Sequence, residues 1–266
     1  MEFFVFQDEV VEAWQRCIKS GLNPTTDKPQ HFLSGRRLEE KLNKYNELIK
    51  VFRDCIDDII NLITGDHFFL LTDKDLILLS MAGDNSLTKR LINNGIKPGI
   101  SLQENSCGIN ALCLAYQLKQ SVYLTPEQHF CKFFRKWYCA AIPLKIFNNT
   151  IGYLDVSTIA YNMQKEQLAI VKLLSDKILN EMKFSQFSKY EDILSKQEKE
   201  ILVLLATGKT EDEIANRLFC TKETIKYHKH QIFTKMDVKN TSAAIAKLSG
   251  FSVICSEDNN KENDLI

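Results

Sequence analysis

The sequence predicts an α+β domain, an antiparallel sheet flanked by helices, followed by an all-α domain of four short helices. Three observations support this prediction. Apolar residues recur at helical spacing up to about residue 62, and short apolar runs between turn residues follow to about residue 157. Helical spacing then returns from Leu194, and the chain of 266 residues is long enough for two domains at roughly 100–200 residues each.

Residues 1–62 are interpreted as a helical region that packs on the domain after it. A first helix is expected over residues 9–19, with Gly21 as its stop. Ser34 is placed to cap a second helix, whose apolar stripe continues to Ile60. Such a long amphipathic stripe usually forms core or a dimer seam.

Residues 63–184 are predicted to form the α+β domain. Apolar runs at 67–72 and 76–82 flank Asp73-Lys74-Asp75, a pattern typical of a hairpin. Residues 107–116 read as a helix and 121–124 as extended. Two strands, 138–143 and 151–156, are joined through Asn148-Asn149, and a helix over 165–183 closes the domain. A polar linker is expected at residues 185–193.

Residues 194–250 are predicted to be helical in short pieces. Gly208 ends the first helix, and Thr210 with Glu213 forms a capping box for the second. Thr221 caps a longer third helix that runs to about Met236. A final helix follows, capped by Asn240 or Thr241. Short helices around a tight turn, with a third helix rich in basic residues, make a helix-turn-helix plan. Residues 251–266 are polar and acid-rich, and we expect them to be disordered.

Charge and cysteine content narrow the function classes. The whole chain is neutral, with 34 basic and 34 acidic residues, but residues 194–250 hold ten basic and seven acidic residues, a net +3. The longest apolar runs are far shorter than the roughly 20 residues that cross a bilayer, and the acidic N-terminus is unlike a signal peptide. We therefore expect a cytoplasmic protein without membrane contact. Eight cysteines without a C-x-x-C pair favour free thiols.

A gap-free set of motifs marks the helical region: Leu194-Ser195-Lys196-Gln197-Glu198, Ala206-Thr207-Gly208-Lys209-Thr210, Glu213-Ile214-Ala215 and Thr224-Ile225-Lys226-Tyr227-His228. Together they resemble the LuxR-type (GerE-type) DNA-binding domain, whose third helix enters the major groove of double-stranded DNA. The resemblance implies base contacts from Lys226, Tyr227 and His230, and phosphate contacts from Thr221, Lys222, Thr224 and Lys235. It also implies a homodimer formed through residues 241–248.

Two positions depart from the LuxR-type pattern. Gln197 stands where the family commonly has Arg, and Glu211-Asp212 where it often has a polar and basic pair. Both departures are expected to weaken contacts with the DNA backbone.

The α+β region carries motifs of its own: residues 96–111 with Ser106-Cys107-Gly108-Ile109-Asn110, then Gln128-His129-Phe130, Tyr138-Cys139-Ala140 and Ile151-Gly152-Tyr153-Leu154-Asp155. These resemble the GAF domain that heads acetoin- and glycerol-metabolism type activators. There the GAF pocket binds a small effector, and an ATPase domain follows; this chain has no G-x-x-x-x-G-K-[ST] loop. The candidate pocket residues are Cys107, Asn110, His129, Phe133, Phe134, Trp137 and Cys139. The alternative for the aromatic residues is a place in the core.

These features predict a ligand-responsive transcriptional regulator of the bacterial, cytoplasmic type. It would bind DNA as a homodimer and respond to a small effector of unknown identity, with RNA polymerase as a further candidate partner. No cofactor, metal site or catalytic residue is expected. The alternative is a thiol-based redox or metal sensor that uses the cluster of Cys107, Cys113, Cys131 and Cys139. An enzyme is disfavoured because no nucleophile with a base and no metal constellation is evident.

Overall fold

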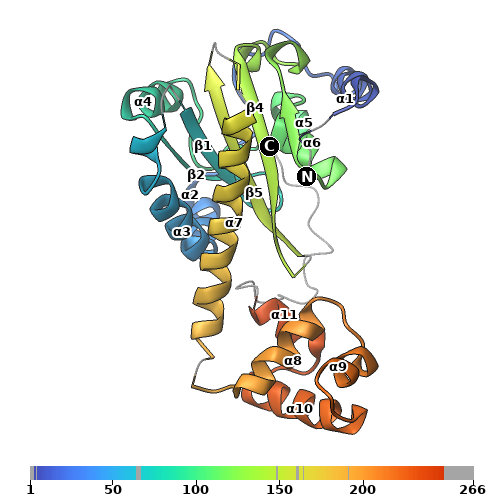
Figure 1. The fold of residues 1–266 in the computed structure, drawn as a ribbon. Coiled ribbons are helices and arrows are strands. Elements are labelled where there is room, and N and C mark those ends of the chain that lie inside the picture. The colour runs from blue at the N-terminus through green and yellow to red at the C-terminus, as the bar shows by residue number, and fades with distance from the viewer. Residues whose placement is uncertain are drawn as a thin grey trace. The chain divides into compact units, whose positions relative to one another are not determined.

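The computed structural model describes residue 3 and residues 5–63, 67–147, 149–159, 162–163, 165–190 and 192–248. The chain divides into two compact units (Figure 1). The first unit comprises residues 1–145 and 150–182, and the second comprises residues 146–149 and 183–266. The predicted acidic tail, residues 251–266, lies outside the described residues.

The N-terminal region contains three helices rather than the two predicted. Helix α1 spans Gln7–Lys19, α2 spans Gly35–Lys44 and α3 spans Asn46–Asp57, followed by a 3-10 turn at Ile60–Leu62. The single long helix predicted after Ser34 is wrong, because the backbone leaves helical geometry at Tyr45 (φ −103°, ψ 13°). This break allows the Tyr45 side chain to be buried. The predicted stripe does form core in α3, through Leu48, Phe52, Cys55 and Ile56.

A five-stranded antiparallel sheet forms the centre of the first unit, as the sequence predicts. Its strands are β1 (His67–Thr72), β2 (Leu78–Gly83), β3 (Val122–Leu124), β4 (Trp137–Ile146) and β5 (Asn149–Ile159), in the order β2-β1-β5-β4-β3. β1 and β2 form the predicted hairpin, and β1 pairs with β5 so that Leu70 lies opposite Asp155. β4 and β5 are longer than predicted; Asn149 belongs to β5, and Asn148 lies outside the described residues.

Helices cover both faces of the sheet. Helix α7 (Lys165–Ser188) crosses the sheet in front in Figure 1, and its length includes residues 185–188, which the sequence analysis assigned to the linker. The other face packs on α1, α5 (Glu104–Cys107) and α6 (Ala111–Leu118), with Phe68 and Leu70 in the shared core. Helix α4 (Asn85–Asn93) was not predicted.

The helix predicted at residues 107–116 is divided into α5 and α6 at Gly108. This glycine has φ +70°, and a Cβ there would lie 3.0 Å from both the Cys131 Sγ and the Phe130 Cβ. The chain can therefore turn only with glycine at this position. Asn110 begins α6, and its side chain caps the helix by accepting a hydrogen bond from the Cys113 N–H at 3.1 Å.

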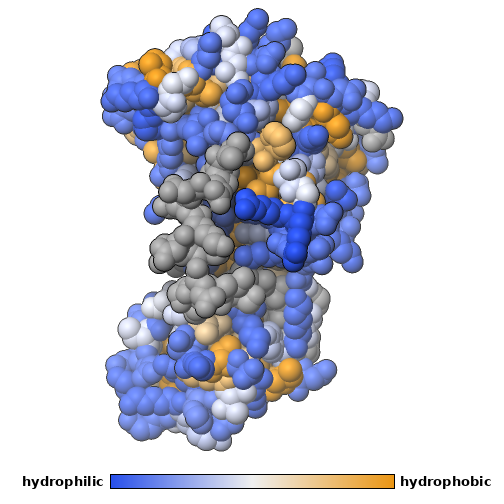
Figure 2. Space-filling view, turned by 180° about the vertical axis from the view of Figure 1, so that it is seen from behind, coloured by the Kyte–Doolittle hydropathy of each residue, from blue (hydrophilic) through white to orange (hydrophobic). Residues whose placement is uncertain are grey.

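The second unit is the predicted set of four helices: α8 (Lys196–Ala206), α9 (Glu211–Arg217), α10 (Lys222–Lys235) and α11 (Thr241–Leu248). The Thr210 and Glu213 capping box and the Thr221 cap are confirmed. Asn240 caps the last helix, accepting a hydrogen bond from the Ala243 N–H at 2.8 Å. Each unit has its own apolar core, and the surface in Figure 2 is mostly hydrophilic with small hydrophobic patches. Within the described ranges, no helix has the length and apolar character that crossing a bilayer requires.

Candidate nucleic-acid interface and sensor cavity

Helix α10 is held in the second unit by its apolar side and presents a polar side to solvent. Ile225 and Ile232, seven residues apart, are buried among α8, α9 and α11. The Thr221 hydroxyl accepts a hydrogen bond from the Thr224 N–H at 3.2 Å, which fixes the first turn. The helix therefore starts at a defined residue, and its exposed positions are fixed relative to the core.

The three residues predicted to contact bases share the exposed side of α10. Lys226, Tyr227 and His230 are all exposed, and Tyr227 has an exposed fraction of 61%. Lys226 has neither a hydrogen bond nor an ion pair within the described part of the chain. A lysine in this state can donate to a base edge or a phosphate without first leaving a protein partner.

Two other lysines of α10 are in a different state: Lys222, which the sequence predicts as a phosphate contact, and Lys229, which it does not, are both paired with acids. Lys222 Nζ lies 2.7 Å from Asp212 Oδ2, and Lys229 Nζ lies 2.7 Å from Glu211 Oε1. The two acids are the departures noted in the sequence, and the structure places both beside α10. Each therefore competes with a phosphate for its lysine.

The predicted phosphate ligand Lys235 contacts both oxygens of a buried carboxylate. Its Nζ lies 2.9 and 2.7 Å from the two carboxylate oxygens of Glu198, a residue only 3% exposed. The same carboxylate accepts the Ser195 N–H at 2.7 Å, completing a capping box at the start of α8. Burial raises the pKa of Glu198, but the hydrogen bonds from Lys235 and Ser195 outweigh this effect and leave the pKa lowered. The pair joins α10 to α8, which gives Lys235 a structural role.

The first unit contains a small cavity between the sheet and α6. Its volume is about 10 Å³, room for about one water-sized group. Four of the predicted pocket residues line it: Asn110, Phe134, Trp137 and Cys139. The other lining residues, which the sequence analysis did not select, are Leu70, Leu102, Ala111, Leu112, Asp155 and Ser157.

Asp155 and Ser157 bring polar chemistry into this otherwise apolar space. Both lie on the same side of β5, and Asp155 is 2% exposed. The Ser157 hydroxyl lies 2.5 Å from Asp155 Oδ1 and 3.2 Å from Cys139 Sγ. Burial raises the pKa of Asp155 to about 7. An acid flanked directly by Leu154 and Val156 in a buried strand is the sequence signal that was available for this site.

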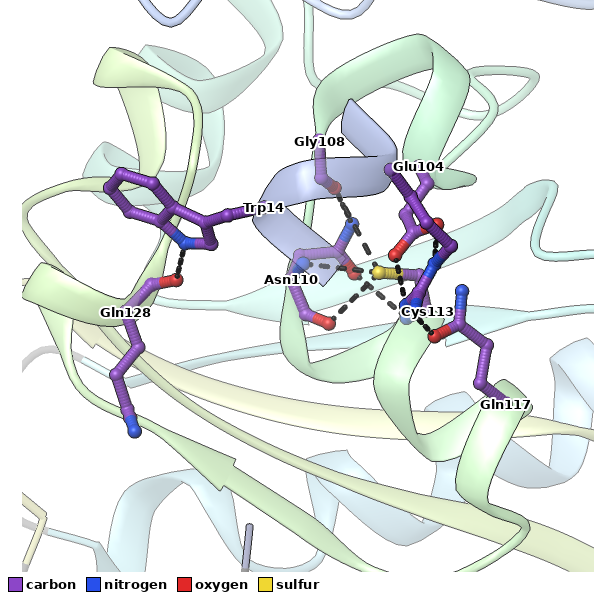
Figure 3. Close-up of polar contacts among 8 residues, drawn as sticks. Trp14, Glu104, Gly108, Asn110, Cys113, Gln117 and Gln128 are labelled. Carbon is purple, nitrogen blue, oxygen red and sulfur yellow. Dashed lines mark hydrogen bonds and ion pairs between the residues drawn. The ribbon is translucent and has the colours of Figure 1, made fainter. Parts of the chain in front are cut away.

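Asn110 supports the cavity wall rather than offering free polar atoms to it. Its amide nitrogen donates to the Leu102 and Gly108 carbonyls at 2.9 and 3.0 Å, and its oxygen accepts the Cys113 N–H. Figure 3 shows the contacts of Asn110 with Gly108 and Cys113 at the start of α6 and, separately, the Trp14 side chain, which donates to the Gln128 carbonyl at 2.9 Å.

The remaining predicted pocket residues lie close by but outside the lining. The Phe133 ring stacks on Phe134, with centroids 3.8 Å apart, and His129 packs on the Phe134 ring at 5.5 Å. Phe133 and Phe134 belong to a 3-10 turn at Lys132–Phe134 and Trp137 begins β4, and the three rings cluster. His129 is fully buried; its Nδ1 contacts the Thr125 carbonyl at 3.0 Å, and burial lowers its pKa to about 4.

The predicted cysteine cluster is divided between two places. Cys107, Cys113 and Cys131 lie near Cys17 of α1, whereas Cys139 lies on the sheet beside the cavity. All five thiols are buried, and burial raises their pKa values. Reactive sensor thiols are accessible and have lowered pKa values. Among the described residues, no group of three His, Cys, Asp or Glu side chains could hold a metal ion.

Comparison with known proteins agrees with this division into two units. Residues 192–248 match the family model described as bacterial regulatory proteins, luxR family. The transcriptional regulatory protein LiaR of Bacillus subtilis is 49% identical over 53 residues, which is 20% of this chain and 25% of LiaR.

Longer matches cover more of the chain at lower identity. A signal-transduction and transcriptional-control protein of Clostridium beijerinckii is 25% identical over 156 residues, 58% of this chain and 25% of that protein. The acetoin dehydrogenase operon activator AcoR of B. subtilis is 21% identical over 168 residues, 62% of this chain and 28% of AcoR. The chain thus spans about a quarter of the length of these relatives.

A solved structure supports the fold of the first unit. The N-terminal part of Escherichia coli DhaR, crystallised with DhaL, superposes with a TM-score of 0.63 at 19% identity, covering 73% of this chain and 66% of that chain. Residues 192–248 are therefore a LuxR-type helix-turn-helix domain, and the chain before them contains a GAF-like domain resembling those of DhaR- and AcoR-type activators.

Proposed function

We propose that this chain is a transcriptional regulator in which the helix-turn-helix domain binds operator DNA and the GAF-like domain binds a small effector. The observation that carries the proposal is the exposed Lys226, which has no ion pair among the described residues, together with Tyr227 and His230 on the solvent side of a capped α10. A helix presented in this way is suited to the major groove. The names of the relatives, a LiaR regulator and an AcoR activator, support the same activity.

The small size of the DNA-binding domain supports binding to paired half-sites. One α10 reads only a few base pairs, so useful specificity requires two copies of the domain on the DNA. Helix α11 (Thr241–Leu248) is the proposed dimer contact, and effector binding would shift the population of dimers able to engage both half-sites. Contact with RNA polymerase stays a prediction.

Band-shift and footprinting assays with DNA from upstream of the chain's own gene test the proposal. We expect salt-sensitive, sequence-selective binding, and a loss of about 1–3 kcal/mol for Lys226→Ala on the selected site. Lys89→Ala, at an exposed lysine of the first unit, is the matched control and should bind as the wild type does. Absence of selective binding under every salt and ligand condition would refute the function.

A further inference from the structure

The cavity of the GAF-like domain contains one acidic side chain and, among its described lining residues, no basic one. Its polar members are Asn110, Asp155 and Ser157. The Asn110 amide uses its hydrogen bonds on the backbone of its own loop. The Asp155 carboxyl and the Ser157 hydroxyl are therefore the groups left to contact a bound molecule.

The environment of Asp155 is unfavourable for an isolated carboxylate. The side chain lies in the apolar face of the sheet, opposite Leu70, and within the described part of the chain no Lys, Arg or His forms an ion pair with it. Its hydrogen-bond partner is Ser157. Burying a carboxylate without a countercharge carries a large desolvation penalty, and acids placed in this way are concentrated at binding and catalytic sites.

Aromatic rings provide the rest of the recognition chemistry. Phe134 and Trp137 both line the cavity and meet edge to face, with centroids 4.9 Å apart. Aromatic faces attract organic cations, and a desolvated carboxylate repels anions. We propose that this cavity binds a small organic ammonium ion, a primary amine, whose charged head pairs with Asp155 and lies against the aromatic wall. This inference rests on the proposed function, since it names the effector class of the same domain.

The size of the cavity limits the ligand. Its volume of about 10 Å³ accommodates an ammonium head and little more. The alkyl part requires the wall to open at the 3-10 turn Lys132–Phe134, where Phe134 stacks on the half-buried Phe133. A short, unbranched amine therefore fits with the smallest rearrangement.

Protonation of Asp155 gives the binding a defined pH dependence. Burial raises the pKa of Asp155 to about 7, so an ammonium ion binds best once the carboxyl has lost its proton. The other titratable side chain among the described lining residues is Cys139 of β4, whose pKa burial raises well above its ordinary value. From α6, β1 and the Phe134 turn no titratable side chain lines the cavity, and His129 behind Phe134 is neutral because burial lowers its pKa to about 4. Affinity should rise about tenfold from pH 6 to pH 8.

Calorimetry on the full chain tests the inference with three ligands of matched size: n-propylammonium, 1-propanol and propionate. We expect n-propylammonium to bind, more tightly at pH 8 than at pH 6 by about tenfold and with proton release at pH 6. The neutral and anionic analogues should not bind. Asp155→Asn should weaken n-propylammonium binding at least tenfold and abolish its pH dependence, whereas Asp27→Asn, at an exposed acid, should leave both unchanged.

Each contrary outcome is decisive. Absence of n-propylammonium binding, equal binding of 1-propanol or propionate, or unchanged amine affinity in an Asp155→Asn protein that melts as a folded domain would overturn the ammonium site. DNA binding is measured separately by band shift on the same protein. If another small molecule alters DNA binding, the proposed function stands and only the ligand class fails. If n-propylammonium binds but no operator is found, the ammonium site stands and the proposed DNA-binding function fails.

Discussion

Glu211 and Asp212 of α9 should weaken DNA binding, because each of them occupies a lysine of α10. Lys229 and Glu211 form a pair at 2.7 Å in which the side chains are only 22% and 23% exposed, and Lys222 pairs with Asp212 at the same distance. A phosphate must displace the carboxylate to gain either lysine. Replacing the acids by amides, in Glu211→Gln and Asp212→Asn, removes the competitor and keeps the side-chain size.

The size of the effect follows from counterion release. Each phosphate neutralised by the protein adds about −0.9 to the slope of log K against log salt concentration. One freed lysine should therefore increase the ratio of affinities at 50 and 200 mM salt by about 3.5-fold, and both lysines by about 12-fold. Affinity at the lower salt concentration should rise in the same order, with the double variant the tightest.

Fluorescence anisotropy with a labelled duplex over this salt range measures both quantities. Glu200→Gln removes an equal charge from an exposed position of α8 and serves as the control. Melting curves establish that each variant is folded. If the folded double variant has the wild-type slope, or if Glu200→Gln changes the slope as much, then Glu211 and Asp212 do not compete with DNA.

Three further predictions concern stability and thiol chemistry. Lys235→Met should destabilise the second unit by about 1–3 kcal/mol, less than a fully buried pair because Lys235 is 36% exposed. Since the pKa of Glu198 is lowered in the folded state, this difference should shrink as the pH falls through that lowered pKa; Lys239→Met is the control, and equal melting of both would contradict the role assigned to Lys235. Asn110→Ala should cost about 2–3 kcal/mol in urea unfolding, because the cap of α6 and two carbonyl partners are lost; a change below 0.5 kcal/mol would count against this account. Among the described cysteines, Cys220 alone is not buried and should react first with a disulfide reagent; rapid labelling of a buried thiol would revive the redox alternative.

The helix-turn-helix region was predictable because local rules determine it. Capping by Thr210 with Glu213 and by Thr221 depends on residues three positions apart, and the core positions follow one helical period. A similar local signal at Asp84 was overlooked. Its carboxylate accepts the Ser86 and Leu87 N–H groups and starts α4.

The parts that sequence reasoning missed depend on tertiary contacts. Nothing within the apolar stripe shows that the helix breaks at Tyr45, whose side chain is buried in the folded unit. The polar character of the cavity was missed for the same reason. Asp155 and Ser157 become neighbours of Trp137 and Asn110 only once β5 lies between β1 and β4 and α6 covers that face.

The lysines of α10 show why a count of charges and the structure lead to different expectations for DNA binding. The residue count gives the helix-turn-helix region a net charge of +3, although the whole chain is neutral. A neutral chain can therefore still have a basic DNA-binding domain. Within α10, however, Lys222, Lys229 and Lys235 are each paired with an acid from α8 or α9, which leaves Lys226 as the helix lysine without such a pair among the described residues. A phosphate must displace an acid of α9 to gain Lys222 or Lys229, whereas the buried Glu198 keeps Lys235 paired to α8 and stabilises the fold. Selective binding should therefore depend on Lys226 and on a second copy of the domain more than on the total charge.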